Sequence, residues 1–213
     1  ATEGKSISTP VGSAAWGMLL KAAQDNKLKF TLKNQSPAVG AANIAAGKID
    51  AHSDFCPWSE IMEFRGTGRK VFDGSEAGVP YLHGVVVRKD LAEDYPEVVQ
   101  AFIKAVYDAG KWISSDPIRA TDLMEKWTGV EKEVLYIYFS KGGHLTLDPT
   151  IKPKWTEALE FDHGVLTREK KIPPLDFSDW IDEKYIRAAY KEMGVDYDKD
   201  KSEMVDPVEA NAG

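Results

Sequence analysis

The chain has 213 residues, of which 43% are hydrophobic and 29% charged, and its formal net charge at pH 7 is −7. A chain of this length and hydrophobic content can bury a sizeable core, either as one large domain or as two small ones. The acidic balance excludes a global positive field that would attract nucleic acid, and no apolar stretch is long enough to predict a transmembrane helix. The single cysteine, Cys56, excludes an internal disulfide and leaves the redox compartment undecided.

The N-terminal region predicts a short strand that leads directly into a helix. The strand is expected at residues 5–9, and Ser13 is a suitable N-cap because apolar residues follow it at helical spacing from Trp16 onward. Free backbone N–H groups and the positive end of the helix dipole would then point to a position just beyond the strand's carboxyl end. Such a position suits an anion or another oxygen-rich small molecule.

Two further strand–helix units follow at similar spacing. Residues 28–33 alternate like a half-buried strand, and a helix rich in small residues is expected after Pro37, able to pack very closely on a sheet. Residues 49–55 predict the next strand, and Pro57 starts another helix. This order predicts a parallel sheet with right-handed crossovers, which binds ligands beyond the carboxyl ends of its strands.

The rest of the chain is predicted to be mainly helical. A short strand is expected at residues 70–72 and a β-rich run at 81–87, and the tail from residue 196 to 213 is polar and expected to be frayed or extended. Helices are expected from Pro96 onward, separated by glycine and proline residues, at 96–112, 117–127, 132–139, 154–163 and 179–193.

Several of these segments resemble one family of proteins. They are Pro-x-Gly-Ser at residues 10–13 with Leu-Leu at 19–20, and Ser-Pro-Ala with Ala-Gly-x-Ile-Asp-Ala at 36–51. Together they resemble the second lobe of periplasmic substrate-binding proteins of the nitrate/sulfonate/taurine type, the receptors of ABC transporters. Residues 84–102 resemble the strand and helix by which that family's chain returns to its first lobe. Residues 146–193 resemble its C-terminal helices.

The resemblance implies an α/β fold of the type II periplasmic-binding-protein class. Residues 1–80 would form the parallel-sheet second lobe, and residues 81–195 the hinge-crossing strand and the helical part that completes the first lobe, followed by the polar tail. Family members begin with a first-lobe segment that this chain lacks, so the chain is expected to be a fragment. The sheet packed under residues Val98 to Trp112 would then lose its partners and expose apolar surface, and a missing N-terminal segment of the same protein is an expected partner.

The loop before the first helix contains the first candidate binding residues, Gly12, Ser13, Ala14 and Ala15. From the residues alone, helix capping is the favoured role of Ser13, because serine caps are common. The resemblance reverses that order, and implies that backbone N–H groups of the two alanines bind an anionic head group.

A second group of candidates lies around the third strand and the crossing between lobes. Trp58 suits a cleft wall because an indole covers an apolar ligand body and donates to its polar end. Core packing is the alternative for Phe55 and Trp58, helix capping for Asp54, and a structural role for His52, which alternates with Asp54 on the strand. The position of the crossing also makes Tyr81 and His83 candidate wall residues.

No catalytic, metal or cofactor site is predicted. Cys56 precedes a helix and lies four residues after His52, but no acid or second histidine has triad spacing. The four histidines, His52, His83, His144 and His163, are dispersed without metal-ligand spacing.

The resemblance implies a receptor that captures a small anion, such as a sulfonate, taurine or nitrate, in an interlobe cleft and docks to an ABC permease. Its location would be periplasmic, or extracellular and membrane-tethered. Two alternatives remain open. One is an enzyme on the same fold, similar to a pyrimidine-precursor synthase or a desulfinase. The other is the effector-sensing domain of a transcription regulator.

Overall fold

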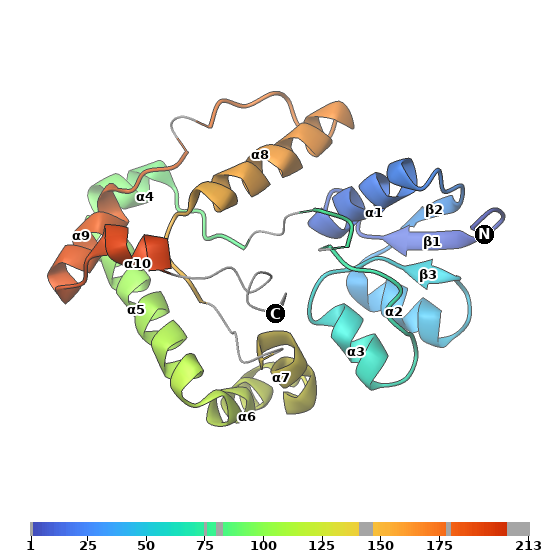
Figure 1. Cartoon of the computed structure of the whole chain (residues 1–213), viewed down its shortest axis with the longest axis horizontal. Helices are drawn as coiled ribbons and strands as arrows, with labels where there is room; N and C mark the ends of the chain where they lie inside the picture. Colours follow the sequence, from blue (N-terminus) through green and yellow to red (C-terminus); the bar gives the residue numbers. More distant parts are fainter. Residues whose placement is uncertain (1, 75, 80–82, 141–146, 178–179, 204–213) are drawn as a thin grey trace. The chain divides into compact units, whose positions relative to one another are not determined.

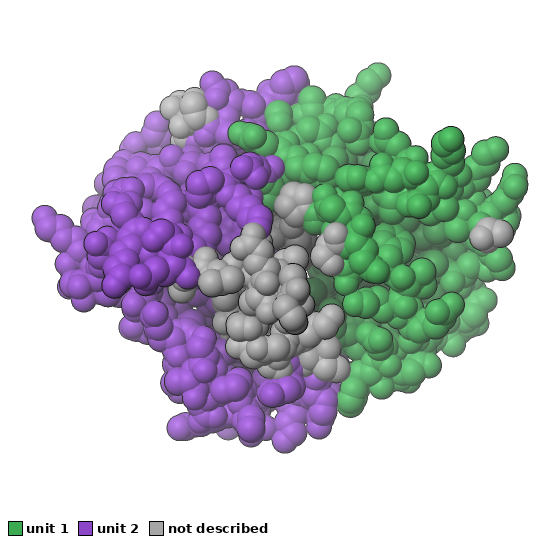
Figure 2. Space-filling model, viewed as in Figure 1, with its two compact units in different colours: residues 1–81, 158–173 green, residues 82–157, 174–213 purple. Residues whose placement is uncertain are grey.

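The computed structural model describes residues 2–74, 76–79, 83–140, 147–177 and 180–203 (Figure 1). The chain divides into two compact units, shown in different colours in Figure 2. Unit 1 contains residues 1–81 and 158–173, and unit 2 contains residues 82–157 and 174–213. The chain therefore leaves unit 1 after the first third of its length and returns to it through one helical segment.

Unit 1 is built on a three-stranded parallel sheet, as the sequence predicts. The strands are β1 (Ser6–Thr9), β2 (Thr31–Asn34) and β3 (Ala51–His52), in the order β2-β1-β3. Ile7 of β1 is in register with Leu32 on one side and with Ala51 on the other. Because all three strands run parallel, the loops that follow them meet at one edge of the sheet.

Helices of unit 1 cover both faces of this sheet. They are α1 (Ala14–Asp25), α2 (Pro37–Ala45), α3 (Trp58–Phe64) and, from residue 158 onward, the second part of α8 (Pro153–Arg168). Figure 1 shows α1 on one side of the sheet and α2 with α3 on the other. Ile7 is buried in β1, and α1 contributes Trp16 and Leu19, which are 4% and 2% exposed. Burial of these side chains stabilises unit 1 by about 1.5–3 kcal/mol for each large residue.

The predicted close packing of α2 on the sheet is confirmed at Gly40. A Cβ built on Gly40 would lie 2.1 Å from Cε1 and 2.2 Å from Nε2 of His52. No real side chain tolerates such distances, so the imidazole ring of β3 lies directly against the backbone of α2. The small residues of α2 thus allow the helix to pack closely against β3.

Unit 2 is helical in its described part. It contains α4 (Lys89–Asp94), α5 (Pro96–Ser115), α6 (Pro117–Thr128), α7 (Lys132–Ser140), α9 (Lys184–Met193) and α10 (Tyr197–Glu203). Its core joins α5, α9 and α10 through three tyrosines. The ring of Tyr190 makes edge contacts with Tyr107 and Tyr197, with centroids 5.4 and 5.2 Å apart, and its hydroxyl donates to Asp200 at 2.8 Å.

Four sequence expectations about secondary structure are wrong. Residues 70–72 and 83–87 form no strand, because within the described residues no neighbouring strand pairs with them. The strand expected at 28–33 is β2, which starts at Thr31 and is exposed throughout because it lies at the edge of the sheet. Residues 197–203 form α10 rather than an extended tail, because Tyr197 is buried against Tyr190.

Replacement of Gly40 by alanine should destabilise unit 1. The added methyl group must displace the His52 ring or move α2, which costs about 1–3 kcal/mol of the free energy of unfolding. Gly164→Ala in α8 is the matched control, since a Cβ there meets nothing within 4 Å. That control should stabilise the helix by about 0.5–1 kcal/mol. Urea unfolding of the two variants measures both effects, and equal midpoints would contradict the close approach.

Candidate functional site

The first turn of α1 presents free hydrogen-bond donors beyond the carboxyl end of β1. Ser13 is the N-cap, as predicted: its Oγ accepts from the Trp16 N–H at 3.3 Å, and its carbonyl accepts from the Gly17 N–H at 3.1 Å. Among the described residues, neither the Ala14 nor the Ala15 N–H has an acceptor. Two donors at the positive end of a helix dipole are a favourable environment for an anion.

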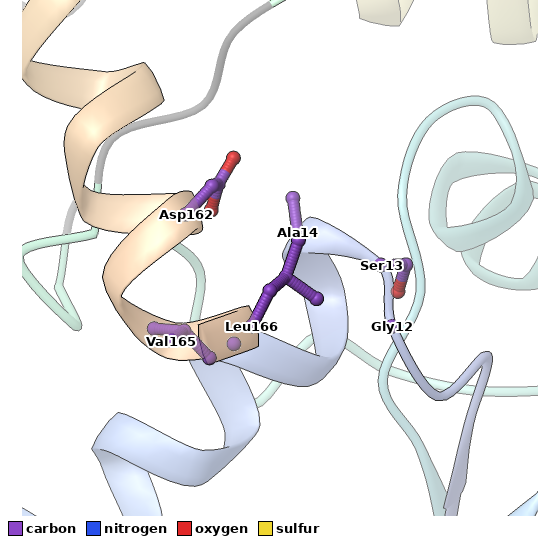
Figure 3. Close-up of a pocket in the computed structure, with 7 residues that line it drawn as sticks. Gly12, Ser13, Ala14, Asp162, Val165 and Leu166 are labelled. Atoms are coloured by element: carbon purple, nitrogen blue, oxygen red, sulfur yellow. The ribbon is translucent and has the colours of Figure 1, made fainter. Parts of the chain in front are cut away.

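A small cavity opens beside this turn. Its volume is about 50 Å³. The lining residues come from the loop and start of α1 and from α8, and are Gly12, Ser13, Ala14, Gly17, Asp162, Val165 and Leu166. Figure 3 shows Asp162 on one side of this space and Ser13 on the other. All of these residues belong to unit 1.

Asp162 is the one acidic side chain that lines the cavity. Burial raises the pKa of its carboxyl group above the ordinary value, and no hydrogen bond to it is found among the described residues. The sequence analysis missed this residue, although a local signal exists. Asp162 lies one turn after Ala158 and one turn before Val165, both buried, so it places a carboxyl group on the apolar stripe of α8.

The polar residues at the carboxyl end of β1 are buried. Thr9 is fully buried, and its Oγ1 has no hydrogen-bond partner among the described residues. Ser8 is also fully buried, and its Oγ lies 2.7 Å from Nδ1 of His52. Since an unpaired buried hydroxyl costs about 1–3 kcal/mol, Thr9 marks a position where an additional polar group would be stabilised.

His52 is held at both ring nitrogens. Nδ1 lies 2.7 Å from Oγ and 3.1 Å from the carbonyl oxygen of Ser8, and Nε2 lies 2.7 Å from Oδ2 of Asp54. The side chains of His52 and Asp54 are 0% exposed. Both were predicted as possible ligand contacts. In this structure their polar atoms contact each other, the Ser8 hydroxyl and the backbone.

This serine–histidine–aspartate chain has the residue types of a nucleophilic triad but not its accessibility. Ser8 is 0% exposed and belongs to the central strand of the sheet. A nucleophile must reach a substrate atom, and this hydroxyl cannot. The chain of hydrogen bonds is therefore structural.

The loop after β3 is connected to both β1 and α1. The Ser53 N–H donates to the Ser8 carbonyl at 2.8 Å, and Ser53 Oγ donates to the Ala15 carbonyl at 2.9 Å. The Phe55 N–H donates to Oδ1 of Asp54 at 2.8 Å. Phe55 and Trp58 are half-buried at the end of this loop. The strand end thus positions two aromatic residues on the same unit as the α1 N-terminus.

Of the predicted binding residues, the structure brings Gly12, Ser13 and Ala14 together around the cavity. Ala15 is buried in the same turn. His83 is exposed and lies in unit 2, and Tyr81 lies outside the described residues.

Cys56 does not have the properties of a catalytic thiol. Burial, together with the nearby carboxylate of Glu60, raises its pKa from 9.0 to about 12. The thiol therefore stays protonated at neutral pH, and a protonated thiol is a poor nucleophile. Within the part of the chain that the structure describes, no group of three or more His, Cys, Asp and Glu residues could hold a metal ion. Across the same residues, no helix combines the length and apolarity needed to span a bilayer.

Comparisons of the sequence find relatives among binding proteins. Residues 31–125 match the NMT1-like family. The taurine-binding periplasmic protein of Escherichia coli (strain K12) is 35% identical over 121 residues, which cover 54% of this chain and 37% of that protein. The chain therefore spans well under half of this curated relative.

Solved structures show the same fold at low sequence identity. The periplasmic aliphatic sulphonate binding protein SsuA of Escherichia coli matches with a TM-score of 0.66 and 20% identity, over 86% of this chain and 64% of that one. A ligand-binding component of an ABC-type import system from Staphylococcus aureus, solved with zinc bound, matches with a TM-score of 0.69 and 20% identity over 87% and 64%. The alkanesulfonate-binding protein SsuA of Xanthomonas axonopodis pv. citri, bound to MOPS, matches with a TM-score of 0.63 and 19% identity over 80% and 60%.

These matches confirm two predictions made from the sequence. The chain has the α/β fold of type II periplasmic binding proteins. As the sequence resemblance predicts, parts of the chain are also similar to the NMT1-like family and to a taurine-binding periplasmic protein.

Replacement of Ser13 by alanine should lower the free energy of unfolding by about 1 kcal/mol, because the cap to the Trp16 N–H is lost. Ser36→Ala is the matched control. Ser36 is the N-cap of α2 but makes no side-chain cap hydrogen bond, so its replacement should cost clearly less. Thermal or urea unfolding measures both, and an equal cost at the two serines would show that Ser13 does not cap α1.

Proposed function

We propose that this chain forms the second lobe and part of the first lobe of a solute-binding receptor of an ABC importer. The observation that supports this most directly is the pair of free N–H groups, at Ala14 and Ala15, beside a cavity at the start of α1. The relation to a taurine-binding protein and to sulfonate-binding folds supports a sulfonate as the bound group. A sulfonate carries three acceptor oxygens, which match donors at a helix N-terminus.

The ligand that best fits the cavity carries a cationic group as well as an anionic one. Asp162 faces the same space as the α1 N-terminus, so a simple anion such as nitrate would meet an ionised carboxyl group. A zwitterion avoids this repulsion by directing its sulfonate to α1 and its ammonium group to Asp162. An amino-sulfonate of the size of taurine is therefore the proposed ligand, with Phe55 and Trp58 as walls for its carbon skeleton.

Ligand capture in this proposal occurs between two lobes that close on the solute. Hinge closure follows when the ligand binds the closed state more tightly than the open one, and the closed form then docks to a membrane permease. His83 and Tyr81 would contribute from the crossing between lobes, and the location would be periplasmic, or extracellular and membrane-tethered. The enzyme reading has less support, because the Cys56 thiol is protonated and Ser8 is buried. The alternative of an effector-sensing domain of a transcription regulator is not favoured either, because the relatives are named as binding proteins.

The second proposed partner is a companion segment that covers an apolar face of α5. On this helix Val98, Phe102 and Trp112 are 52%, 50% and 36% exposed. They lie on one face: Phe102 follows Val98 by four residues, Ala105 follows Phe102 by three, and Trp112 lies two turns (seven residues) after Ala105. A face of this kind normally packs against another element. Since about a third of each matched structure has no counterpart in this chain, we assign that element to the uncovered part of the fold.

Taurine should bind the protein more tightly than ethanesulfonate, and Asp162→Asn should reverse this preference. Loss of a charge-assisted contact to the ammonium group costs about 1.5–3 kcal/mol, so taurine affinity should fall at least tenfold. Ethanesulfonate affinity should rise, because the competing negative charge is removed. Wild-type taurine affinity should also fall as pH is lowered through the raised pKa of Asp162, and the variant should lack this dependence.

Isothermal titration calorimetry with both sulfonates measures these affinities. Asp25→Asn is the matched control, since Asp25 lies at the opposite end of α1 and pairs with Lys21. It should leave both affinities unchanged. If the wild type bound neither sulfonate, the proposed ligand class would be wrong. If Asp162→Asn lowered the affinities for taurine and ethanesulfonate equally, the proposed contact between the ammonium group and Asp162 would be wrong.

The companion segment is tested by native mass spectrometry and by substitutions on α5. A polypeptide that supplies the uncovered part of the fold, added to this chain of 23.6 kDa, should bind it. Phe102→Asp should release that polypeptide, whereas Ile118→Asp, at a 66% exposed residue of α6, should not. A lone chain or a homodimer would overturn the assignment.

A further inference from the structure

We infer that His52 is a positioning residue, which fixes the loop 53–57 and with it the two aromatic residues of the proposed ligand wall. The inference concerns one buried chain of hydrogen bonds in unit 1, from Ser8 through His52 to Asp54. Only its consequence for the ligand rests on the proposed function. The order of the loop can be measured without any ligand.

The position of the imidazole ring is determined from three sides. Ser8 of β1 contacts Nδ1, Asp54 contacts Nε2, and the backbone of α2 at Gly40 leaves no room even for a methyl group. A side chain so enclosed has one rotamer available to it. The ring therefore transmits the position of β1 and α2 to the carboxyl group of Asp54.

The hydrogen-bond pattern involves every polar atom of the two side chains. Nε2 of His52 lies 2.7 Å from Oδ2 of Asp54, and Nδ1 lies within hydrogen-bond distance of both the hydroxyl and the carbonyl oxygen of Ser8. Asp54 then uses its second oxygen, Oδ1, to accept from the Phe55 N–H. Each polar atom of the chain has a partner, so loss of any member leaves a buried group unpaired, at a cost of about 1–3 kcal/mol.

Asp54 is the link between the buried chain and the loop. Its side chain is 0% exposed, yet its Oδ1 holds the first N–H of the segment that leads through Cys56 to Trp58 at the start of α3. The loop is also anchored at its start by Ser53 Oγ, which donates to the Ala15 carbonyl in the first turn of α1, and further along by a contact between Cys56 and Glu60. Release of Asp54 would remove the contact that holds the Phe55 N–H between these two anchors.

Cys56 reports on this loop directly. It is the single cysteine of the chain and lies two residues after Asp54. Its thiol is half-buried and has a raised pKa, so native-state labelling with iodoacetamide at pH 8 should be slow. A loop that opens exposes the thiol, lowers its pKa towards the ordinary value and accelerates labelling.

The experiment measures the rate of Cys56 labelling in His52→Ala, Asp54→Ala and His52→Gln. The two alanine variants should label at least tenfold faster than the wild type. His52→Gln should recover much of the protection, since its side-chain amide can donate to Asp54. Asp50→Ala is the matched control, because Asp50 flanks the other end of β3 and accepts from Ser6 and Lys5. It should lower global stability without raising the labelling rate in the absence of urea.

Global and local opening are separated by the urea dependence of labelling. Local loop opening exposes little surface and should give a weak dependence, whereas global unfolding gives a steep one. If His52→Ala failed to fold, Asp54→Ala would still test the chain, because it removes the loop contact and keeps the ring. Wild-type labelling rates in both alanine variants, or equal acceleration in Asp50→Ala, would overturn the inference.

A second readout connects the loop to the ligand. Taurine affinity should fall at least tenfold in His52→Ala and recover in His52→Gln, with no His52 atom in contact with the ligand. If the wild type did not bind taurine while the labelling pattern held, the proposed ligand would fail and the positioning role would stand. If taurine bound wild type and His52→Ala equally, while labelling accelerated, the loop would not form part of the ligand wall.

Discussion

The central strand β1 is the constraint on which unit 1 depends. Its last two residues, Ser8 and Thr9, are polar and fully buried, because β2 and β3 pair with it on both sides and helices cover both faces. Buried polar groups must find partners or destabilise the fold. Ser8 finds its partner in the His52 ring, and that solution fixes the end of β3. Thr9 Oγ1 has no partner among the described residues. The carboxyl end of β1 therefore keeps one unpaired hydroxyl group next to the loops that follow the strands.

Local features of the sequence predicted local structure well. The N-cap at Ser13 and the small-residue helix after Pro37 were predictable because a cap depends on residues within one turn, and close packing depends on residue size. The same reasoning failed for Val85 and Val86, which are 74% and 85% exposed and form no strand. Valine favours strands only when a neighbouring strand and a packing surface are present, so its propensity alone does not decide the conformation.

Features that depend on distant segments were not predictable from the sequence. Asp162 reaches the cavity because a helix far along the chain returns to unit 1, and nothing near Ser13 indicates this. Likewise His52 and Asp54 look like ligand groups in a strand pattern, and only the structure shows that the His52 ring packs against Ser8 and Gly40 and that both side chains are buried. The residues predicted to contact a ligand therefore fall into two groups: Gly12, Ser13 and Ala14 line the cavity, whereas His52 and Asp54 hold the loop 53–57.

The match to the NMT1-like family spans residues 31–125, whereas the cavity residues lie at 12–17 and 162–166. The family match therefore does not reach the residues that line this cavity. A helix N-terminus stabilises an anion by about 0.3–1 kcal/mol. Two like charges about 5 Å apart repel by roughly 3 kcal/mol at an effective dielectric constant near 20, so an ionised Asp162 would outweigh the helix for a simple anion. The balance reverses when the ligand itself brings a positive charge to the carboxylate. In the proposed receptor, charge pairing across the cavity, more than the helix dipole, would therefore decide which sulfonate the lobe binds.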